Sequence, residues 1–130
     1  MKPLPPLALV CNDSRTLALQ LCQQLEALGL NTDIAGSEAE VFAKAEASEL
    51  IFIELQFSGS NGFQITRQLS GRCNCPLVLV TGTGRSSDLH WALQAGAATV
   101  LTRPVLSSAL QLLLQQLQVV LLPLAARSDV

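Results

Sequence analysis

The sequence has no tyrosine, a single tryptophan and few charged residues, which make up 14% of its 130 positions. Its formal net charge is −2, so it lacks the basic surface with which proteins bind nucleic acid or anionic lipid. The opening stretch, MKPLPPLALVCND, is a short apolar run broken by prolines. It is too short and too interrupted for a signal-peptide core or a membrane-spanning helix. We therefore predict a cytoplasmic protein with no nucleic-acid or membrane partner.

The sequence also lacks a recognisable pattern of metal-binding or disulfide-forming cysteines. Its four cysteines are Cys11, Cys22, Cys73 and Cys75. Their spacing matches no zinc site, and the CNC stretch is tighter than the C-x-x-C of redox and metal centres. Reduced, partly buried thiols are the prediction.

At 130 residues the chain is long enough for one domain with one core, which buries roughly two thirds of the unfolded surface. We predict a domain over residues 1–122. Residues 123–130 would be a C-terminal tail or the start of a linker.

Apolar runs alternate with helical patterns along the chain. The runs, rich in Val, Ile and Leu as buried parallel strands are, cover residues 7–11, 31–35, 50–55, 76–81 and 98–102. Between them, leucines recur at helical spacing up to Gly29, and SEAEVFAKAEA has the pattern of a capping box. Further helices are expected from Ser60 or Asn61, up to Gly96, and over 106–121.

This alternation predicts an α/β fold, a single doubly wound sheet of five parallel strands with helices on both faces. Functional sites in such folds lie at the carboxyl ends of the strands. The residues expected there are Asn12, Asp13, Glu54, Thr81 and Arg103.

The order and spacing of these residues resemble the receiver domain of response regulators in two-component signalling, with its (βα)5, flavodoxin-like topology. The stretches ELIFIELQFSGSNGF, LVTG and LQAGAATVLTRPV carry the resemblance, which covers about residues 7–118. The family has an acidic pair after the first strand, a phosphoaccepting Asp after the third, Thr or Ser after the fourth and Lys-Pro after the fifth.

Several positions depart from the family pattern. Glu54 stands at the phosphoacceptor position, Asn12 replaces one of the acidic pair and Arg103 replaces the lysine. The switch position, aromatic in the family, is Val100, and Ser58 replaces a proline. The resemblance is thus to a degenerate receiver, or pseudo-receiver, that lacks the phosphoacceptor Asp.

These departures weaken phosphoryl transfer, which depends on in-line positioning and on a metal ion that neutralises charge. With Asn12 in place of an acid, a Mg²⁺ ion held by Asp13 would bind weakly or not at all. Glu54 reaches about 1.5 Å farther than Asp, a displacement large enough to slow transfer on the order of a hundredfold. A guanidinium can clamp a carboxylate through two hydrogen bonds, so we predict that Arg103 pairs with Glu54.

The function that we predict is that of a non-phosphorylated receiver, which acts as a protein-binding or regulatory module in bacterial signalling, not as an enzyme and without a cofactor. Glu54 either belongs to a relict pocket or mimics a phosphorylated Asp, and residual phosphorylation is a third alternative. A flavodoxin-like binder of small ligands is less favoured, because CNDSRT places an acid where a phosphate would need donors.

The last helical pattern has an apolar stripe wider than packing on a sheet requires, which predicts a partner surface formed by Leu106, Leu110, Leu112 and Leu113. A homodimer through the fourth helix, fifth strand and fifth helix is one form that such a contact would take. The alternative is that the chain's own tail covers this helix. His90, with no charged partner evident in the sequence, is expected on a solvated helix face.

Overall fold

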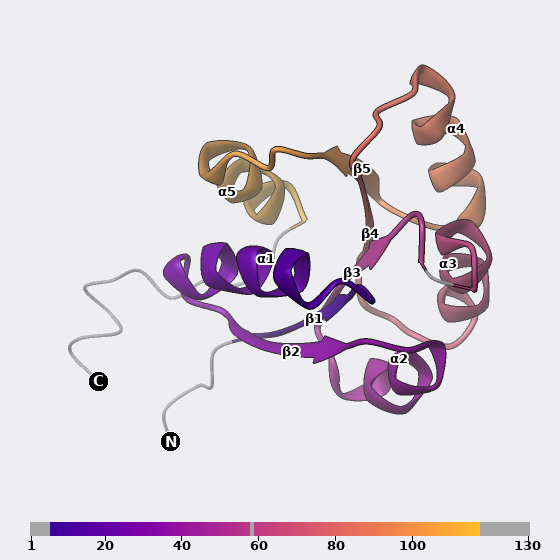
Figure 1. Cartoon of the computed structure of the whole chain (residues 1–130), viewed down its shortest axis with the longest axis horizontal. Helices are drawn as coiled ribbons and strands as arrows, with labels where there is room; N and C mark the ends of the chain where they lie inside the picture. Colours follow the sequence, from indigo (N-terminus) through magenta and orange to yellow (C-terminus); the bar gives the residue numbers. More distant parts are fainter. Residues whose placement is uncertain (1–5, 58, 118–130) are drawn as a thin grey trace.

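The structure is a computed structural model that describes residues 6–57 and 59–117. Its elements follow one another as strand and helix in alternation (Figure 1). They are β1 (Leu7–Cys11), α1 (Arg15–Ala27), β2 (Asn31–Ala35), α2 (Glu38–Lys44), a short 3₁₀ helix η1 (Ala45–Ala47), β3 (Leu50–Glu54), α3 (Gly62–Ser70), β4 (Leu77–Thr81), α4 (Ser86–Ala95), β5 (Thr99–Thr102) and α5 (Ser107–Gln116).

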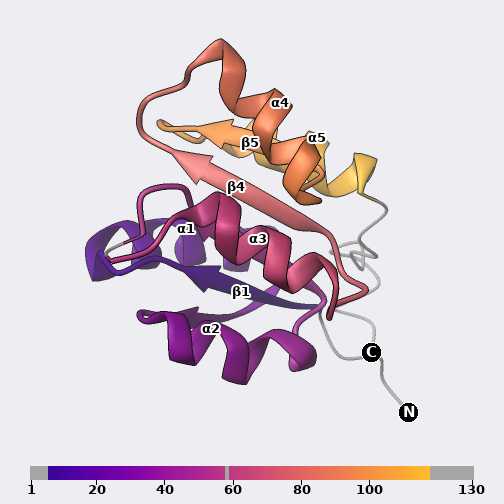
Figure 2. The same ribbon diagram turned by 90° about the vertical axis from the view of Figure 1, so that its right-hand side faces the viewer.

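The five strands form one parallel sheet, as the sequence predicts, and their order is β2-β1-β3-β4-β5. Figure 2 shows the arrowheads of β1, β4 and β5 at the same edge of the sheet, the edge where the α4 segment begins. Because the strand order reverses between β1 and β3, side chains that follow these two strands meet at the switch point.

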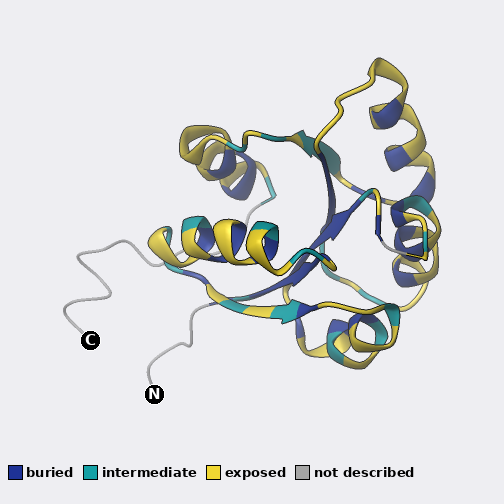
Figure 3. Ribbon diagram, viewed as in Figure 1, coloured by how far each residue is buried: buried dark blue, intermediate teal, exposed yellow. Residues whose placement is uncertain are grey.

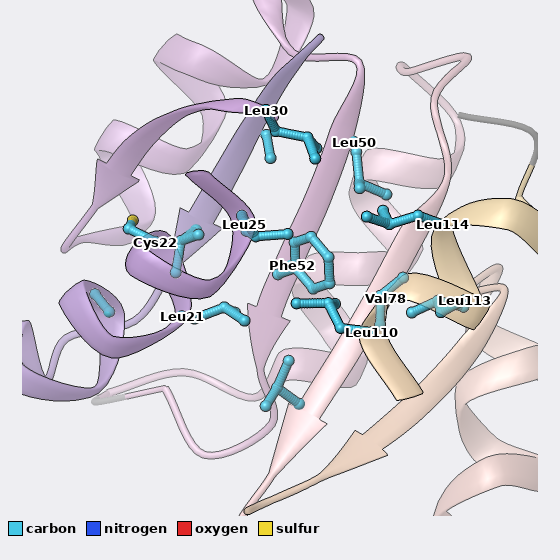
Figure 4. Packing of buried hydrophobic residues seen from close by; sticks show 14 residues of the cluster. Leu21, Cys22, Leu25, Leu30, Leu50, Phe52, Val78, Leu110, Leu113 and Leu114 are labelled. Carbon is cyan, nitrogen blue, oxygen red and sulfur yellow. The ribbon is translucent and has the colours of Figure 1, made fainter. Parts of the chain in front are cut away.

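Helices cover both faces of the sheet, and Figure 3 shows their buried residues turned toward it. On one face, residues of α1 and α5 pack with Phe52 in the core drawn in Figure 4. On the other face, residues of α2, α3 and α4 pack with Ile51 and Ile53. Neighbouring residues of β3 therefore serve opposite faces, since side chains alternate along a strand.

Local signals in the sequence set the helix ends. The hydroxyl of Ser14 accepts a hydrogen bond from the backbone N–H of Leu17, and the side chain of Asn61 caps α3 in the same way. α4 ends at Gly96, whose φ of 106° lies in the left-handed region that glycine adopts without strain. Of the two starts that the sequence left open for the third helix, Ser60 and Asn61, the structure thus selects Asn61.

The fifth helix starts within one residue of its predicted position. It begins at Ser107, and residues beyond 117 lie outside the described part, as does the predicted domain boundary at 122.

Leu110 and Leu113, assigned to the partner surface, are buried against the sheet, whereas Leu106 and Leu112 are 62% and 55% exposed. That part of the surface prediction is wrong, because the sequence does not show which edge of a wide apolar stripe faces the sheet.

The cysteines are as predicted: all four are free thiols. Cys11 and Cys22 are buried, and Cys73 and Cys75 lie half-buried in the segment between α3 and β4.

Candidate functional site

The strands bring the predicted residues to one edge of the sheet, at the ends of β1, β3, β4 and β5. Glu54 and Thr81 are the last residues of β3 and β4, while Asn12 and Arg103 directly follow β1 and β5. Asn12, Glu54 and Thr81 are buried. We refer to Asn12, Asp13, Glu54, Thr81 and Arg103 as the strand-end site.

The strand-end site is organised around an ion pair between Glu54 and Arg103. Nη1 of Arg103 lies 2.6 Å from Oε2 of Glu54, and Nη2 lies 2.9 Å from Oε1. Both carboxylate oxygens therefore accept from one planar guanidinium, the two-fold arrangement that Lys cannot form. The pairing predicted from the sequence is confirmed.

Asn12 completes the surroundings of the carboxylate. Its Nδ2 donates to Oε2 of Glu54 at 3.2 Å, and its Oδ1 accepts from the backbone N–H of Ser14 at 2.8 Å. An aspartate here would place a second negative charge against Glu54. The amide instead donates to Glu54. Asn12 and Glu54, which both depart from the family pattern, are thus joined by a hydrogen bond that the sequence did not predict.

The backbone holds Arg103 in place beside β4. Its N–H donates to the carbonyl of Thr81 at 2.8 Å, which continues the pairing of the two strands. A Cβ at Gly82 would lie 3.1 Å from Nη2 of Arg103, so the absent side chain leaves room for the guanidinium. The hydrogen bonds to Glu54 raise the pKa of Arg103 above its ordinary value, against the opposing effect of burial.

Thr81 is not part of this ion pair. Its Oγ1 accepts from the backbone N–H of Thr83 at 3.2 Å and so shapes the turn after β4. Among the described residues no hydrogen bond joins Thr81 to Glu54. The threonine therefore orders the loop that leads to α4.

The donor set of the strand-end site does not fit a magnesium ion. Mg²⁺ needs several oxygen ligands in octahedral geometry, and carboxylates supply most of the attraction. Both oxygens of Glu54 are taken by Arg103, and the side-chain oxygen of Asn12 accepts from Ser14. Asp13 is the exposed carboxylate nearby, and no cluster of three potential His, Cys, Asp or Glu ligands occurs within the described residues.

The other residues singled out from the sequence lie away from this ion pair. Val100, at the switch position, is half-buried and packs with the core beneath α2, α3 and α4. His90 is exposed on α4, as predicted, and meets the ring of Trp91 edge-on at 5.1 Å. Ser58 lies outside the described residues.

A parallel five-stranded sheet in the order β2-β1-β3-β4-β5, with polar side chains at its carboxyl edge, places the chain in the class of flavodoxin-like α/β domains, which includes receivers. The sequence matches the family described as the response regulator receiver domain over residues 8–115. The chain belongs to this family, and thus to the receivers of two-component signalling.

Named relatives support the assignment. The chain is 31% identical to Protein PilH of Pseudomonas aeruginosa over 102 residues, which are 75% of this chain and 84% of PilH. It is 28% identical to the phosphate regulon transcriptional regulatory protein PhoB of Rhizobium meliloti over 106 residues, 78% of this chain and 46% of PhoB. The chain thus spans less than half the length of PhoB.

Solved structures support the fold. A two-component response regulator from Clostridium difficile superposes with a TM-score of 0.81 at 22% identity, covering 87% of this chain and 95% of that one. A CheY-like receiver domain from Methanospirillum hungatei gives a TM-score of 0.77 at 22% identity, covering 88% and 94%. The predicted fold class is confirmed.

Proposed function

We propose that this chain is a receiver that is not phosphorylated and that acts by binding another protein in bacterial signal transduction. The observation that carries the proposal is the bidentate pair of Arg103 and Glu54, with Asn12 as a further donor to the same carboxylate. In the family resemblance, this carboxylate position is the phosphoacceptor. Here its oxygens are already occupied by donors from the same chain.

Phosphorylation would require the Glu54 carboxylate to act as a nucleophile toward an incoming phosphoryl group. To do so it must leave the guanidinium, and the charge of the phosphoryl group must be neutralised by a metal for which the site is unsuited. Glu is also one methylene longer than Asp, which displaces the attacking oxygen by about 1.5 Å. Each effect lowers the rate of phosphoryl transfer to Glu54, so the ion pair favours a site that is not phosphorylated.

The same geometry argues against a phosphorylation mimic. A mimic would present excess negative charge near Thr81, but the charge of Glu54 is matched by Arg103, and Thr81 is engaged with Thr83. A closed, electrically neutral pair is what a relict pocket would contain. The pair then stabilises one conformation of the strand ends. The partner protein would bind to another part of the surface.

The partner surface that we propose lies on α4, β5 and α5. Its exposed apolar residues in α4 are Leu89, Trp91 and Leu93. On the α5 side they are Leu106 and Leu112. Large exposed apolar side chains are typical of protein contacts, so a signalling protein, a second copy of this chain or other domains of a larger regulator would bind here.

The family membership supports a location in the cytoplasm and another signalling protein as the partner. No helix of the described residues is long and apolar enough to cross a membrane. We infer a cytoplasmic, non-enzymatic module. A related protein, MtrA of Mycolicibacterium smegmatis, is a DNA-binding response regulator. We do not propose DNA binding for this chain, because its net charge of −2 offers no basic surface.

The test is the intact mass of the protein after incubation with Mg²⁺ and acetyl phosphate. We expect no added phosphoryl group on the wild type. The variant Glu54→Asp with Arg103→Lys restores the family residues at two positions and is expected to gain the phosphoryl mass. An added phosphoryl group on the wild type would overturn the proposal and identify a working receiver with a glutamate acceptor.

A further inference from the structure

A cleft opens between α1 and the segment that joins β5 to α5. Its volume is about 320 Å³. Its walls are largely apolar and come from Leu17 and Leu21 of α1, Phe52 of β3, Val80 of β4 and Val105. We call it the α1–α5 cleft.

The position of α5 explains why the described residues leave this space unfilled. Leu110, Leu113 and Leu114 anchor α5 on the sheet, and Figure 4 shows Leu110 beside Phe52 with Leu21 approaching from α1. Leu106, which precedes the first turn of α5, is instead turned to solvent. The apolar side chains of α5 therefore cover the sheet beyond Leu110 and leave the strand-end side open.

Polar groups line one end and the rim of the cleft. Asn12, Glu54 and Arg103 close the end next to the strand-end site. At the rim, Nε2 of Gln24 donates to the carbonyl of Val105 at 2.6 Å, a hydrogen bond that ties α1 to the segment before α5. Gln20 adds a second amide at the rim.

The charges in the cleft cancel. Among the described residues that line it, Glu54 and Arg103 are charged, and they form the ion pair described above. A charged ligand would lose its hydration without gaining an unmatched counter-charge. An apolar body would bury surface against the leucine, phenylalanine and valine side chains, and an amide, carbonyl or hydroxyl could exchange hydrogen bonds with the rim glutamines.

We propose that the α1–α5 cleft is a binding site for an uncharged amphipathic small molecule, with an apolar body and one hydrogen-bonding group. Its size lies at the lower end of the range of small-molecule sites, which are concave and mostly apolar with a few polar groups. This site is independent of the protein contact proposed above, which uses the exposed residues of α4 and α5. A ligand in the cleft would contact Arg103, which belongs to the strand-end site.

The probe for the test is acetanilide, an aromatic ring with one neutral amide, added to the full chain labelled with ¹⁵N. We expect backbone amide shifts at Leu17, Leu21 and Val105, with a dissociation constant on the order of millimolar for so small a probe. Benzoate, which has a similar ring and a negative charge, should bind more weakly by roughly tenfold.

Two tryptophan variants localise the binding. Leu17→Trp adds bulk inside the cleft and should weaken acetanilide binding by roughly tenfold or more. Leu19→Trp is the matched control, because Leu19 is exposed on the same helix and does not line the cleft. Val105→Phe fills the cleft from its other wall and replaces Leu17→Trp if thermal unfolding shows that variant to be unfolded.

The opposite results would overturn the proposal. It fails if acetanilide shifts no cleft amide, if benzoate binds as well as acetanilide, or if the filling variants bind like Leu19→Trp. Nuclear Overhauser contacts between the methyl groups of Val119–Leu122 and Leu21 in the free protein would show that the chain's own tail is the occupant.

Discussion

Arg103 and Glu54 face each other across β4, with both guanidinium Nη atoms on the two oxygens of the carboxylate at 2.6 and 2.9 Å. The side chain of Glu54 is 7% exposed, whereas that of Arg103 is 25% exposed. The carboxylate thus carries most of the desolvation cost of this pair. Such a pair contributes little net stability when intact, but loss of one partner leaves the other charge buried and unmatched.

Replacement of Arg103 tests this asymmetry. Arg103→Met should lower the free energy of unfolding by about 2 kcal/mol, because the buried carboxylate loses both charged donors. Arg103→Lys should cost about 1 kcal/mol, since an ammonium keeps the charge but not the two-fold geometry. Urea unfolding measures both. Arg67→Lys on the exposed face of α3 is the control, and equal losses for Lys and Met at position 103 would contradict the role of the bidentate contact.

Restoring an acid at position 12 tests the role of the amide. Asn12→Asp replaces the 3.2 Å hydrogen bond to Glu54 by two like charges, so we expect about 1 kcal/mol of destabilisation without metal. Mg²⁺ should then raise the melting temperature of the variant more than that of the wild type, because two carboxylates attract the ion. The measurement is thermal unfolding with and without Mg²⁺. An equal response of both proteins would argue that position 12 does not control metal binding.

The start of α3 fixes the backbone of Glu54 through close packing at Gly62. A Cβ at Gly62 would lie 2.6 Å from the carbonyl oxygen of Glu54 and 2.7 Å from Cα of Leu55. Gly62→Ala should therefore cost about 2–3 kcal/mol, because the clash involves backbone that cannot move freely. Gly71→Ala, at the other end of α3, is the control. Its nearest contact would be 3.9 Å, and it should change stability by less than about 0.5 kcal/mol.

The raised pKa values of the cysteine thiols predict a loss of stability at alkaline pH. Burial, followed by the effect of neighbouring Cys73, raises the pKa of Cys75 from 9.0 to about 11, and burial also raises that of Cys11. The folded state therefore favours the protonated thiol. The resulting stabilisation is full below pH 9 and is lost between pH 9 and 11, as the unfolded chain releases its protons first. Urea unfolding over this window should show a steeper decline for the wild type than for Cys75→Ala, and equal slopes would contradict the assignment.

The corrected partner surface separates binding from stability. Leu106→Ser with Leu112→Ser removes exposed apolar area and should leave the free energy of unfolding within about 0.5 kcal/mol of wild type. The same pair should weaken any self-association seen by sedimentation. Leu110→Ala, in the core, should instead cost about 2–5 kcal/mol. A large loss of stability in the double serine variant would show that these two leucines serve the core.

The strand-end site shows how far reasoning from the sequence could reach. Glu54 and Arg103 stand at the ends of parallel strands, which predicted that they would meet. The long side chain of Glu54 and the planar guanidinium of Arg103 predicted the pair of hydrogen bonds between them. The donation from Asn12 to the same oxygen was not predicted, because it depends on a distance between side chains on separate strands. A signal existed in that both positions depart from the family pattern together.

The sequence by itself determined the alternation of strands and helices, the helix caps and the set of residues at the strand ends. These features follow from local chemistry and from the rule that parallel strands end at one edge. The tertiary structure alone decided that Leu110 and Leu113 belong to the core and that a cleft remains between α1 and α5. Both depend on how α5 sits against the sheet, which is set by packing among distant segments that no local pattern encodes.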